Sequence, residues 1–343
     1  MNEKSIQEAT PVSATAVEEA APRLQTMSSN EFQEAFEKIV SNCANVIKGK
    51  DEQIRLVLTA MLSDGHVLME DMPGTGKTML ARTIAMSCAV KTNRIQCTPD
   101  LLPSDITGAP ILDMATNAFS FREGPVFSNV LLVDEINRAT PKTQAALLEA
   151  MQEKQVTVDG RTYRLPRPFI MLATQNPIEL AGTFPLPEAQ LDRFMVKLSL
   201  GYPNREGEQD LVRANLVQEA IIGLEPVVEV DDVLSLAAHA TTVKVPEAVS
   251  NYIIDIVQAT RSDPALMMGG SPRATLALIR GCRVRAASQG RDDVYPDDVR
   301  ALLVPVLAHR MILTPDAQLR DETVGKVVER ILARVKVPLG VGG

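Results

Sequence analysis

The segment from Asp71 to Thr78, DMPGTGKT, constrains the fold more than any other part of this chain. An apolar run at residues 66–70 leads into it, and a helix pattern over residues 77–89 follows at once. A strand, a glycine-containing loop and a helix in that order form the setting of a phosphate-binding P-loop. Backbone amides from about Gly74 to Thr78 can then point at a phosphate, aided by the positive end of the helix dipole. The segment therefore predicts a nucleotide site on an α/β fold.

One residue departs from the usual P-loop pattern, because Asp71 stands where that pattern opens with glycine. Asp71 lies where the chain leaves the strand, before the amides that would surround the phosphate, so its carboxylate can point away. The alternative is a tight strand-to-helix turn in which Lys77 and Thr78 occur by chance. In the nucleotide interpretation Lys77 reaches the β- and γ-phosphates and the Thr78 hydroxyl is a ligand of Mg²⁺. The residues assigned to nucleotide binding are Pro73, Gly74, Thr75, Gly76, Lys77, Thr78 and Met79.

A second signal is VLLVDE at residues 130–135, in which four apolar residues end in two carboxylates. A buried strand would place Asp134 and Glu135 at the edge of the sheet where P-loop chemistry occurs. We assign Asp134 to Mg²⁺ binding and Glu135 to polarising the attacking water, since hydrolysis of the γ-phosphate needs a positioned acceptor. The alternative, an ordinary acidic strand end, is weakened by the P-loop upstream.

Three further polar residues are candidates for catalysis. Asn176 follows the apolar run at residues 169–173 and is placed to hold the water, although asparagine is also a common turn residue. Arg193 fits either an arginine finger that reaches the γ-phosphate of a neighbouring subunit or a surface salt bridge with Asp192 or Glu188. Arg273 lies in the first turn of a helix, where dipole and guanidinium can both face phosphate, or it belongs to an ordinary basic helix.

The remaining pattern predicts a parallel sheet followed by a helical region. Five short apolar runs mostly alternate with helix patterns, which is typical of a parallel sheet with crossover helices. These runs are residues 66–70, 94–97, 130–133, 169–173 and 194–198. Two hairpins are expected, one pairing residues 111–113 with 119–121 and one at residues 155–165 around Asp159-Gly160. From Arg205 onward the chain reads as helices, and the clearest has Ser271 as N-cap and a body at residues 272–289.

Composition narrows the function classes. Thirty-five Lys and Arg against 43 Asp and Glu give a net charge of −8, which provides no general attraction to a polyanion, and nucleic acid is not expected as a partner. No apolar run approaches the ~18 residues of a membrane span, so no membrane insertion is expected. Residues 1–26 have almost no large apolar side chains and are expected to form a disordered tail. The absence of a signal-peptide core and of CxxC spacing favours a reduced, cytoplasmic location.

Taken together, these motifs resemble the MoxR family of AAA+ ATPases, over roughly residues 35 to 340. The segments that carry the resemblance are GHVLMEDMPGTGKT, CTPDLLPSDITG, LLVDEINRATPKTQAALLEAMQE, MLATQNP, FPLPEAQLDRF and GGSPRA. The resemblance implies an α/β fold, with a P-loop αβα core around a five-stranded parallel sheet at residues 27–203 and a smaller all-helical lid at residues 204–343. It implies a homo-oligomer, a hexameric ring with ATP and Mg²⁺ at subunit interfaces. Asn176 is then the first sensor, Arg193 the finger acting on the neighbour, and Arg273 the second sensor on the lid.

The function expected from this resemblance is that of a chaperone-like motor. It would hydrolyse ATP to remodel or mature a client protein, with a partner that contains a von Willebrand factor A domain. Two alternatives stay open. A nucleic-acid-dependent ATPase shares the same core, although acidic charge and 3% aromatic residues argue against base stacking. A nucleotide-gated scaffold would assemble a complex without steady turnover, and would still function with Glu135 disabled.

Overall fold

A five-stranded parallel sheet forms the centre of the computed structural model. The residues that the structure describes are 24–72, 74–115, 117–176, 182–202, 205, 208–209 and 223–338. The strand order is β2-β5-β8-β1-β9. Their bounds are β1 Val67–Glu70, β2 Thr92–Gln96, β5 Val130–Asp134, β8 Ile170–Gln175 and β9 Val196–Leu198. Each of the five predicted apolar runs therefore overlaps one strand, and the predicted sheet is confirmed.

Helices cover both faces of the sheet, which gives three layers. Successive side chains of a strand point to opposite faces, so Leu132 of β5 joins one core, while its neighbours Leu131 and Val133 join the other. The first core is shared with α1, α2 and α3, and the second with α5. The helices of this part are α1 Ser29–Val46, α2 Asp51–Leu62, α3 Lys77–Ser87, α4 Pro103–Thr107, α5 Pro141–Glu153 and α6 Glu188–Leu191, with a 3-10 turn η1 at Ile136–Arg138. The expected αβα core is present.

Register brings the functional ends of the strands together. Gln96 at the end of β2 pairs with Asp134 at the end of β5, and Glu70 at the end of β1 pairs with Gln175 at the end of β8. The carboxyl ends of parallel strands meet at one edge of a sheet, which is where ligands bind in folds of this kind. The P-loop after β1 and the acidic pair at the end of β5 therefore lie at the same edge of the sheet.

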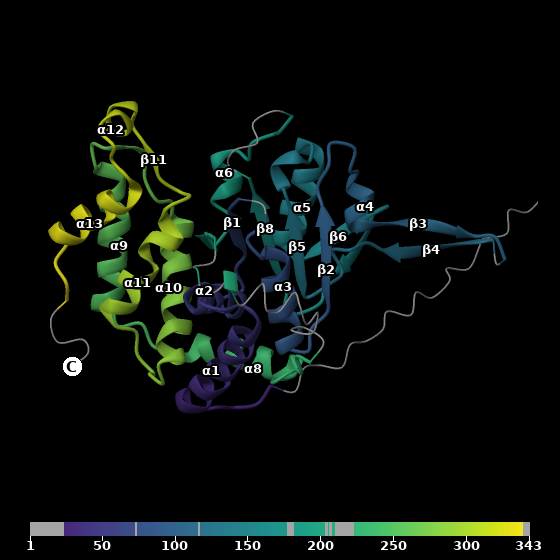
Figure 1. Ribbon diagram of the computed structural model, residues 1–343, viewed down its shortest axis with the longest axis horizontal. Helices are drawn as coiled ribbons and strands as arrows, with labels where there is room; N and C mark the ends of the chain where they lie inside the picture. Colours follow the sequence, from purple (N-terminus) through teal and green to yellow (C-terminus); the bar gives the residue numbers. More distant parts are fainter. Residues whose placement is uncertain are drawn as a thin grey trace, which may run out of the picture.

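Both predicted hairpins are present. β3 Gly108–Asp113 pairs with β4 Ala118–Glu123, and β6 Gln155–Val158 pairs with β7 Arg161–Arg164. The second turns through Asp159 and Gly160, both at positive φ, as a two-residue hairpin turn requires. Phe121 of β4 stacks on Tyr163 of β7 with ring centroids 4.1 Å apart, so the two hairpins support each other. The β3–β4 hairpin extends from the end of the molecule opposite the C-terminal helices (Figure 1).

Residues 223–338, the described part of the C-terminal region, are mainly helical and include two short strands. Its helices are α8 Val230–Thr242, α9 Glu247–Ser262, α10 Pro272–Ser288, α11 Pro296–Leu307, α12 Pro315–Leu319 and α13 Val324–Arg334. Ser271 is the N-cap of α10, as predicted, and accepts from the Arg273 amide. β10 Leu266–Met268 and β11 Ile312–Leu313 form an antiparallel pair that the sequence analysis did not predict. Strands of two or three residues are too short to show a period-two pattern.

The lid packs directly on the core. One apolar cluster runs from the sheet through α1, α2 and α3 into α8, α9, α10 and α11. Residues 1–23 of the expected tail lie outside the described residues, and the Gln25 amide already donates to Ser235 Oγ of α8 at 3.0 Å. The predicted boundary between residues 203 and 204 also falls where most of the chain is not described, and stays a prediction. No helix in the described part of the chain is long and apolar enough to span a membrane.

Candidate active site

The loop between β1 and α3 has the backbone geometry of a phosphate cradle. Gly74 and Gly76 have φ values of 81° and 89°, in the left-handed region that favours glycine. An added Cβ would meet no atom within 4 Å at either position, so the backbone angle, and not crowding, is the reason for glycine. Gly76 is the N-cap of α3, and its φ turns the chain into the helix at Lys77. The amides at the start of α3 therefore open toward the cavity above the loop.

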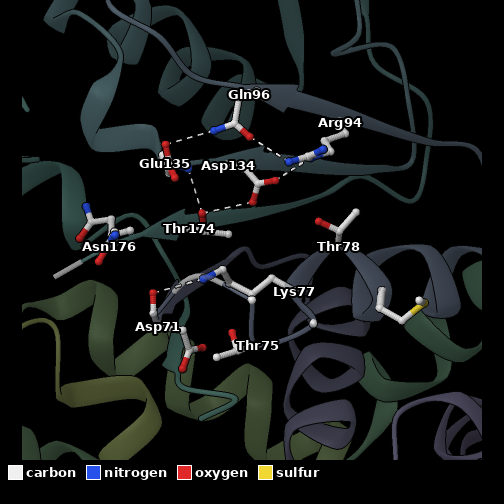
Figure 2. Close-up of a pocket in the computed structure, with 14 residues that line it drawn as sticks. Asp71, Thr75, Lys77, Thr78, Arg94, Gln96, Asp134, Glu135, Thr174 and Asn176 are labelled. Atoms are coloured by element: carbon white, nitrogen blue, oxygen red, sulfur yellow. Dashed lines mark hydrogen bonds and ion pairs between the residues drawn. The ribbon is translucent and has the colours of Figure 1, made fainter. Parts of the chain in front are cut away.

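The carboxylate of Asp71 points away from that cradle, as its position in the sequence predicts. Ser199 Oγ donates to its Oδ1 at 2.6 Å, and the Leu200 and Gly201 amides donate to Oδ2 and Oδ1 at 2.7 and 2.9 Å. Asp71 is 5% exposed, and Figure 2 shows its carboxylate directed away from Asp134 and Glu135. Asp71 therefore does not direct its carboxylate at the phosphate position.

Asp134 and Glu135 lie at the end of β5, within a hydrogen-bonded network (Figure 2). Arg94 Nε donates to Asp134 Oδ2 at 2.6 Å, and Thr174 Oγ1 donates to Asp134 Oδ1 at 3.3 Å. Thr174 Oγ1 also accepts from the Glu135 amide at 2.9 Å, so one hydroxyl of β8 fixes both acidic residues. Arg94, Gln96 and Thr174 were missed in the sequence analysis. Alternation in the run TNRIQ marks Arg94 and Gln96 as polar residues on one face, but their nearness to Asp134 depends on the strand order.

Glu135 is held in an unusual backbone conformation. Its φ is 56°, which costs about 1–3 kcal/mol for a residue with a side chain and is found most often at functional sites. Gln96 Nε2 and Arg138 Nη1 donate to its Oε2 at 3.1 and 3.0 Å. Among the described residues no hydrogen bond reaches Oε1, so this oxygen can accept a proton from water.

A cavity of about 420 Å³ unites the P-loop with the ends of β2, β5 and β8. Predicted site residues that line it are Gly74, Thr75, Gly76, Lys77, Thr78, Met79, Asp134, Glu135 and Asn176. Pro73 lies outside the described residues. Lys77 Nζ donates to the backbone carbonyls of Asp71 and Met72 at 3.2 and 3.0 Å, at the floor of the cavity. The Thr78 hydroxyl and the Asp134 carboxylate supply oxygen ligands of the kind that Mg²⁺ prefers, so the residues fit that ion.

Arg193 and Arg273 do not line this cavity but lie together in a second one of about 440 Å³. Arg280 adds positive charge there, Lys154 is paired with Asp64 of the same cavity, and Arg273 comes within 4.0 Å of Asp192. Arg193 is weakly held, because its Nη1 donates to the Leu148 carbonyl at 3.5 Å and its buried Nε has no hydrogen-bond partner in the described part of the chain. Within the described residues it forms no ion pair with Asp192 or Glu188, so the salt-bridge alternative is not supported.

Asp192 forms its ion pair with Arg310 and not with Arg193. Arg310 is 3% exposed; its Nε donates to Asp192 Oδ1 at 2.9 Å, and its two terminal nitrogens donate to the carbonyls of Asp192, Phe194 and Met195. Ser271 Oγ also donates to the Asp192 carboxylate, at 2.8 Å. Burial lowers the pKa of Arg310, and the Asp192 carboxylate opposes that shift. The lid therefore fixes the backbone on both sides of Arg193 while leaving its guanidinium available.

Replacing Arg310 with methionine is expected to lower the free energy of unfolding by about 3–5 kcal/mol, because the partly buried Asp192 carboxylate and four backbone carbonyls, including that of Val306, each lose a donor. Arg300→Met is the matched control, since Arg300 is exposed on α11, the helix that precedes Arg310, and its replacement should change stability by less than about 0.5 kcal/mol. Denaturant unfolding of both variants measures the difference. Equal midpoints for the two variants would show that the Arg310 network adds nothing to stability.

Comparison with known proteins identifies the family. The model of the ATPase family associated with various cellular activities (AAA) matches residues 66–196, and the AAA lid domain model matches residues 258–331. Chaperone MoxR1 of Mycobacterium tuberculosis is 40% identical over 317 residues, which cover 88% of this chain and 82% of that protein. Protein MoxR of Methylorubrum extorquens is 30% identical over 335 residues, or 90% and 96% of the two chains. The chain belongs to the MoxR family of AAA ATPases.

Two further proteins are similar to this one over most of the chain. Uncharacterized protein YeaC of Bacillus subtilis is 46% identical over 302 residues, which cover 88% of this chain and 94% of that protein. A solved structure from Cytophaga hutchinsonii has a TM-score of 0.85 and 37% identity, and the match covers 90% of this chain and 97% of that one. The predicted MoxR fold, an α/β core with a helical lid, is therefore confirmed.

Proposed function

We propose that this MoxR ATPase hydrolyses Mg-ATP at sites completed by a neighbouring copy of the chain. The observation that carries the proposal is the separation of two sets of residues. The P-loop, Asp134 and Glu135 line one cavity, whereas the two arginines suited to γ-phosphate line another. A transition state with charge on three phosphoryl oxygens needs both sets. Arg193 and Arg273 would therefore meet the nucleotide of the adjoining protomer in a ring, for which we propose six members.

The residues of the first cavity divide the work of hydrolysis. Lys77 would leave the two carbonyls that it contacts and bind the β- and γ-phosphate oxygens, assisted by the amides at the start of α3. Thr78 and Asp134 would hold Mg²⁺, which neutralises phosphate charge when bound. To bind Mg²⁺, Asp134 would have to give up its ion pair with Arg94. The Arg94 side chain is 53% exposed and able to move away. Glu135 would accept a proton from water through Oε1, and Asn176 would orient that water.

What the chain does with the energy of ATP hydrolysis is proposed from its relatives. The 40% identical Mycobacterium tuberculosis protein is a chaperone by name, and we propose that this chain likewise acts on a client protein in the cytoplasm. A separate partner with a von Willebrand factor A domain is the expectation that the family resemblance provides. The chain's charge of −8 supports a protein client over a nucleic acid.

Nucleotide binding is tested with Lys77→Ala. Loss of one charge-assisted contact of about 1.5–3 kcal/mol should weaken binding of a fluorescent ATP analogue by about 10- to 100-fold. Lys142→Ala is the control, because Lys142 is exposed on α5 and does not line the P-loop cavity. Unchanged affinity in Lys77→Ala, or turnover of ATP by that variant at the wild-type rate, would contradict the assignment of the cavity.

A further inference from the structure

Asp71 connects the phosphate loop to a segment that follows the last strand of the core sheet. This segment, residues 199–202, follows β9 directly and precedes the predicted lid in the sequence. Two amides and one hydroxyl of the segment donate to the Asp71 carboxylate at 2.6–2.9 Å. Gly201 has a φ of 61°, a left-handed turn at the end of these contacts. A usual P-loop glycine at position 71 would have no side chain with which to make any of them.

The carbonyls of the same segment are held from the other side. Lys50 Nζ donates to the Leu200 carbonyl and, at 3.2 Å, to the Tyr202 carbonyl. A carboxylate on the amides and an ammonium on the carbonyls leave the segment little freedom to move independently of the core. Charge-assisted hydrogen bonds of this kind are about twice as strong as neutral ones. Any displacement of Asp71 is therefore passed on to residues 199–201.

Asp71 also contacts the lysine expected to bind phosphate. Lys77 Nζ donates to the Asp71 carbonyl at 3.2 Å, so the backbone of this one residue receives the lysine while its side chain holds the connecting segment. Oxygens of a bound phosphate would compete with that carbonyl for the same ammonium protons. A change in the partners of Lys77 would therefore act on the same residue whose carboxylate accepts from the Leu200 and Gly201 amides.

We propose that Asp71 is a positioning residue that couples nucleotide at the P-loop to the connecting segment, residues 199–202, and through it to the lid. The inference rests on the proposed function, because the signal that it transmits is nucleotide binding. It differs from a purely structural role, in which the carboxylate would stabilise the fold equally with and without nucleotide. The two roles are separated by comparing the segment's behaviour in both conditions.

The test combines hydrogen exchange with kinetics on the full chain. In the wild type, ADP is expected to change the exchange rates of the Leu200 and Gly201 amides and of α10 in the lid. In Asp71→Asn and Asp71→Gly, the affinity for ADP should stay within about 3-fold of wild type, because the cradle amides are untouched. The nucleotide-dependent change in exchange should be lost, and kcat should fall by up to about 10²-fold, the cost of a remote change that misplaces catalytic groups. Asp71→Gly is the sharper variant, since it restores the usual P-loop residue.

Two further variants keep the test decisive. Ser199→Ala removes one of the three contacts and leaves both amides bonded, so it should give a smaller effect than Asp71→Asn in a folded protein. Glu70→Gln removes the ion pair with Lys197 between β1 and β9 but no contact to residues 199–202, and should leave the nucleotide response intact. An undiminished change in exchange and an undiminished kcat in both Asp71 variants would overturn the proposal. So would wild-type protein in which bound ADP leaves the exchange rates of residues 199–202 unchanged. Wild-type protein that binds ADP without hydrolysing ATP would contradict the proposed hydrolysis alone.

Discussion

Replacing Glu135 with glutamine is expected to lower kcat for ATP hydrolysis by about 10²- to 10⁴-fold, the usual contribution of a general base. The amide has nearly the same shape, and its carbonyl oxygen can still accept a hydrogen bond from Gln96 or Arg138, so the cavity should keep its form. A neutral amide cannot take the proton from water, however. ATP should therefore remain bound and unhydrolysed.

The measurement pairs steady-state phosphate release with binding of a fluorescent ATP analogue. Glu149→Gln is the matched control, because Glu149 is an exposed carboxylate on α5 outside the cavity and should keep wild-type turnover. Undiminished hydrolysis by Glu135→Gln would reject Glu135 as the acceptor. The same variant, held in its ATP state, is the form with which to capture a client, since its complex with the client should be longest lived in that state.

Removing the Arg193 guanidinium is expected to have an even larger effect, about 10³- to 10⁵-fold on kcat, as for other arginine fingers. Arg193 does not line the P-loop cavity, so Arg193→Ala should bind ATP with wild-type affinity. The protein should also remain folded, because the side chain makes one long hydrogen bond and its Nε makes none within the described residues. The prediction thus separates binding from turnover.

Single-turnover hydrolysis with saturating ATP gives the size of this loss. Arg300→Ala provides the control, because Arg300 is exposed on α11 and lines neither cavity. A loss of stability in Arg193→Ala that matches the loss of rate would assign the residue a structural role. Turnover within a few-fold of wild type would remove Arg193 from the site.

Much of the core could be predicted from the sequence because its signals are local. The P-loop is a contiguous segment whose glycines, lysine and threonine have fixed spacing. The strand β5 is indicated by the four apolar residues before Asp134. The hairpin at Asp159-Gly160 is equally local, since its turn conformation depends on those two residues. The outward direction of Asp71 also followed from its place before the cradle.

Other features depend on contacts between distant segments, and local patterns do not contain them. Asp71 meets residues that lie about 130 positions further along the chain, as the sequence separations of 128 to 130 show. Arg94 and Gln96 reach Asp134 and Glu135 only because β2 lies beside β5 in the sheet. The grouping of Arg193 with Arg273 needs the lid to be placed against α6, which Ser271 and Arg310 achieve through Asp192.

The central claim is that each nucleotide site takes residues from two adjoining protomers, and mixing Glu135→Gln with Arg193→Ala tests it most directly. Each variant alone should be nearly inactive. In a mixed ring, an Arg193→Ala protomer retains Glu135 and can receive Arg193 from a Glu135→Gln neighbour, which restores complete sites. We predict that phosphate release rises on mixing and is highest near equal proportions. Co-assembly of the two variants without any gain in turnover, at every ratio, would contradict the claim.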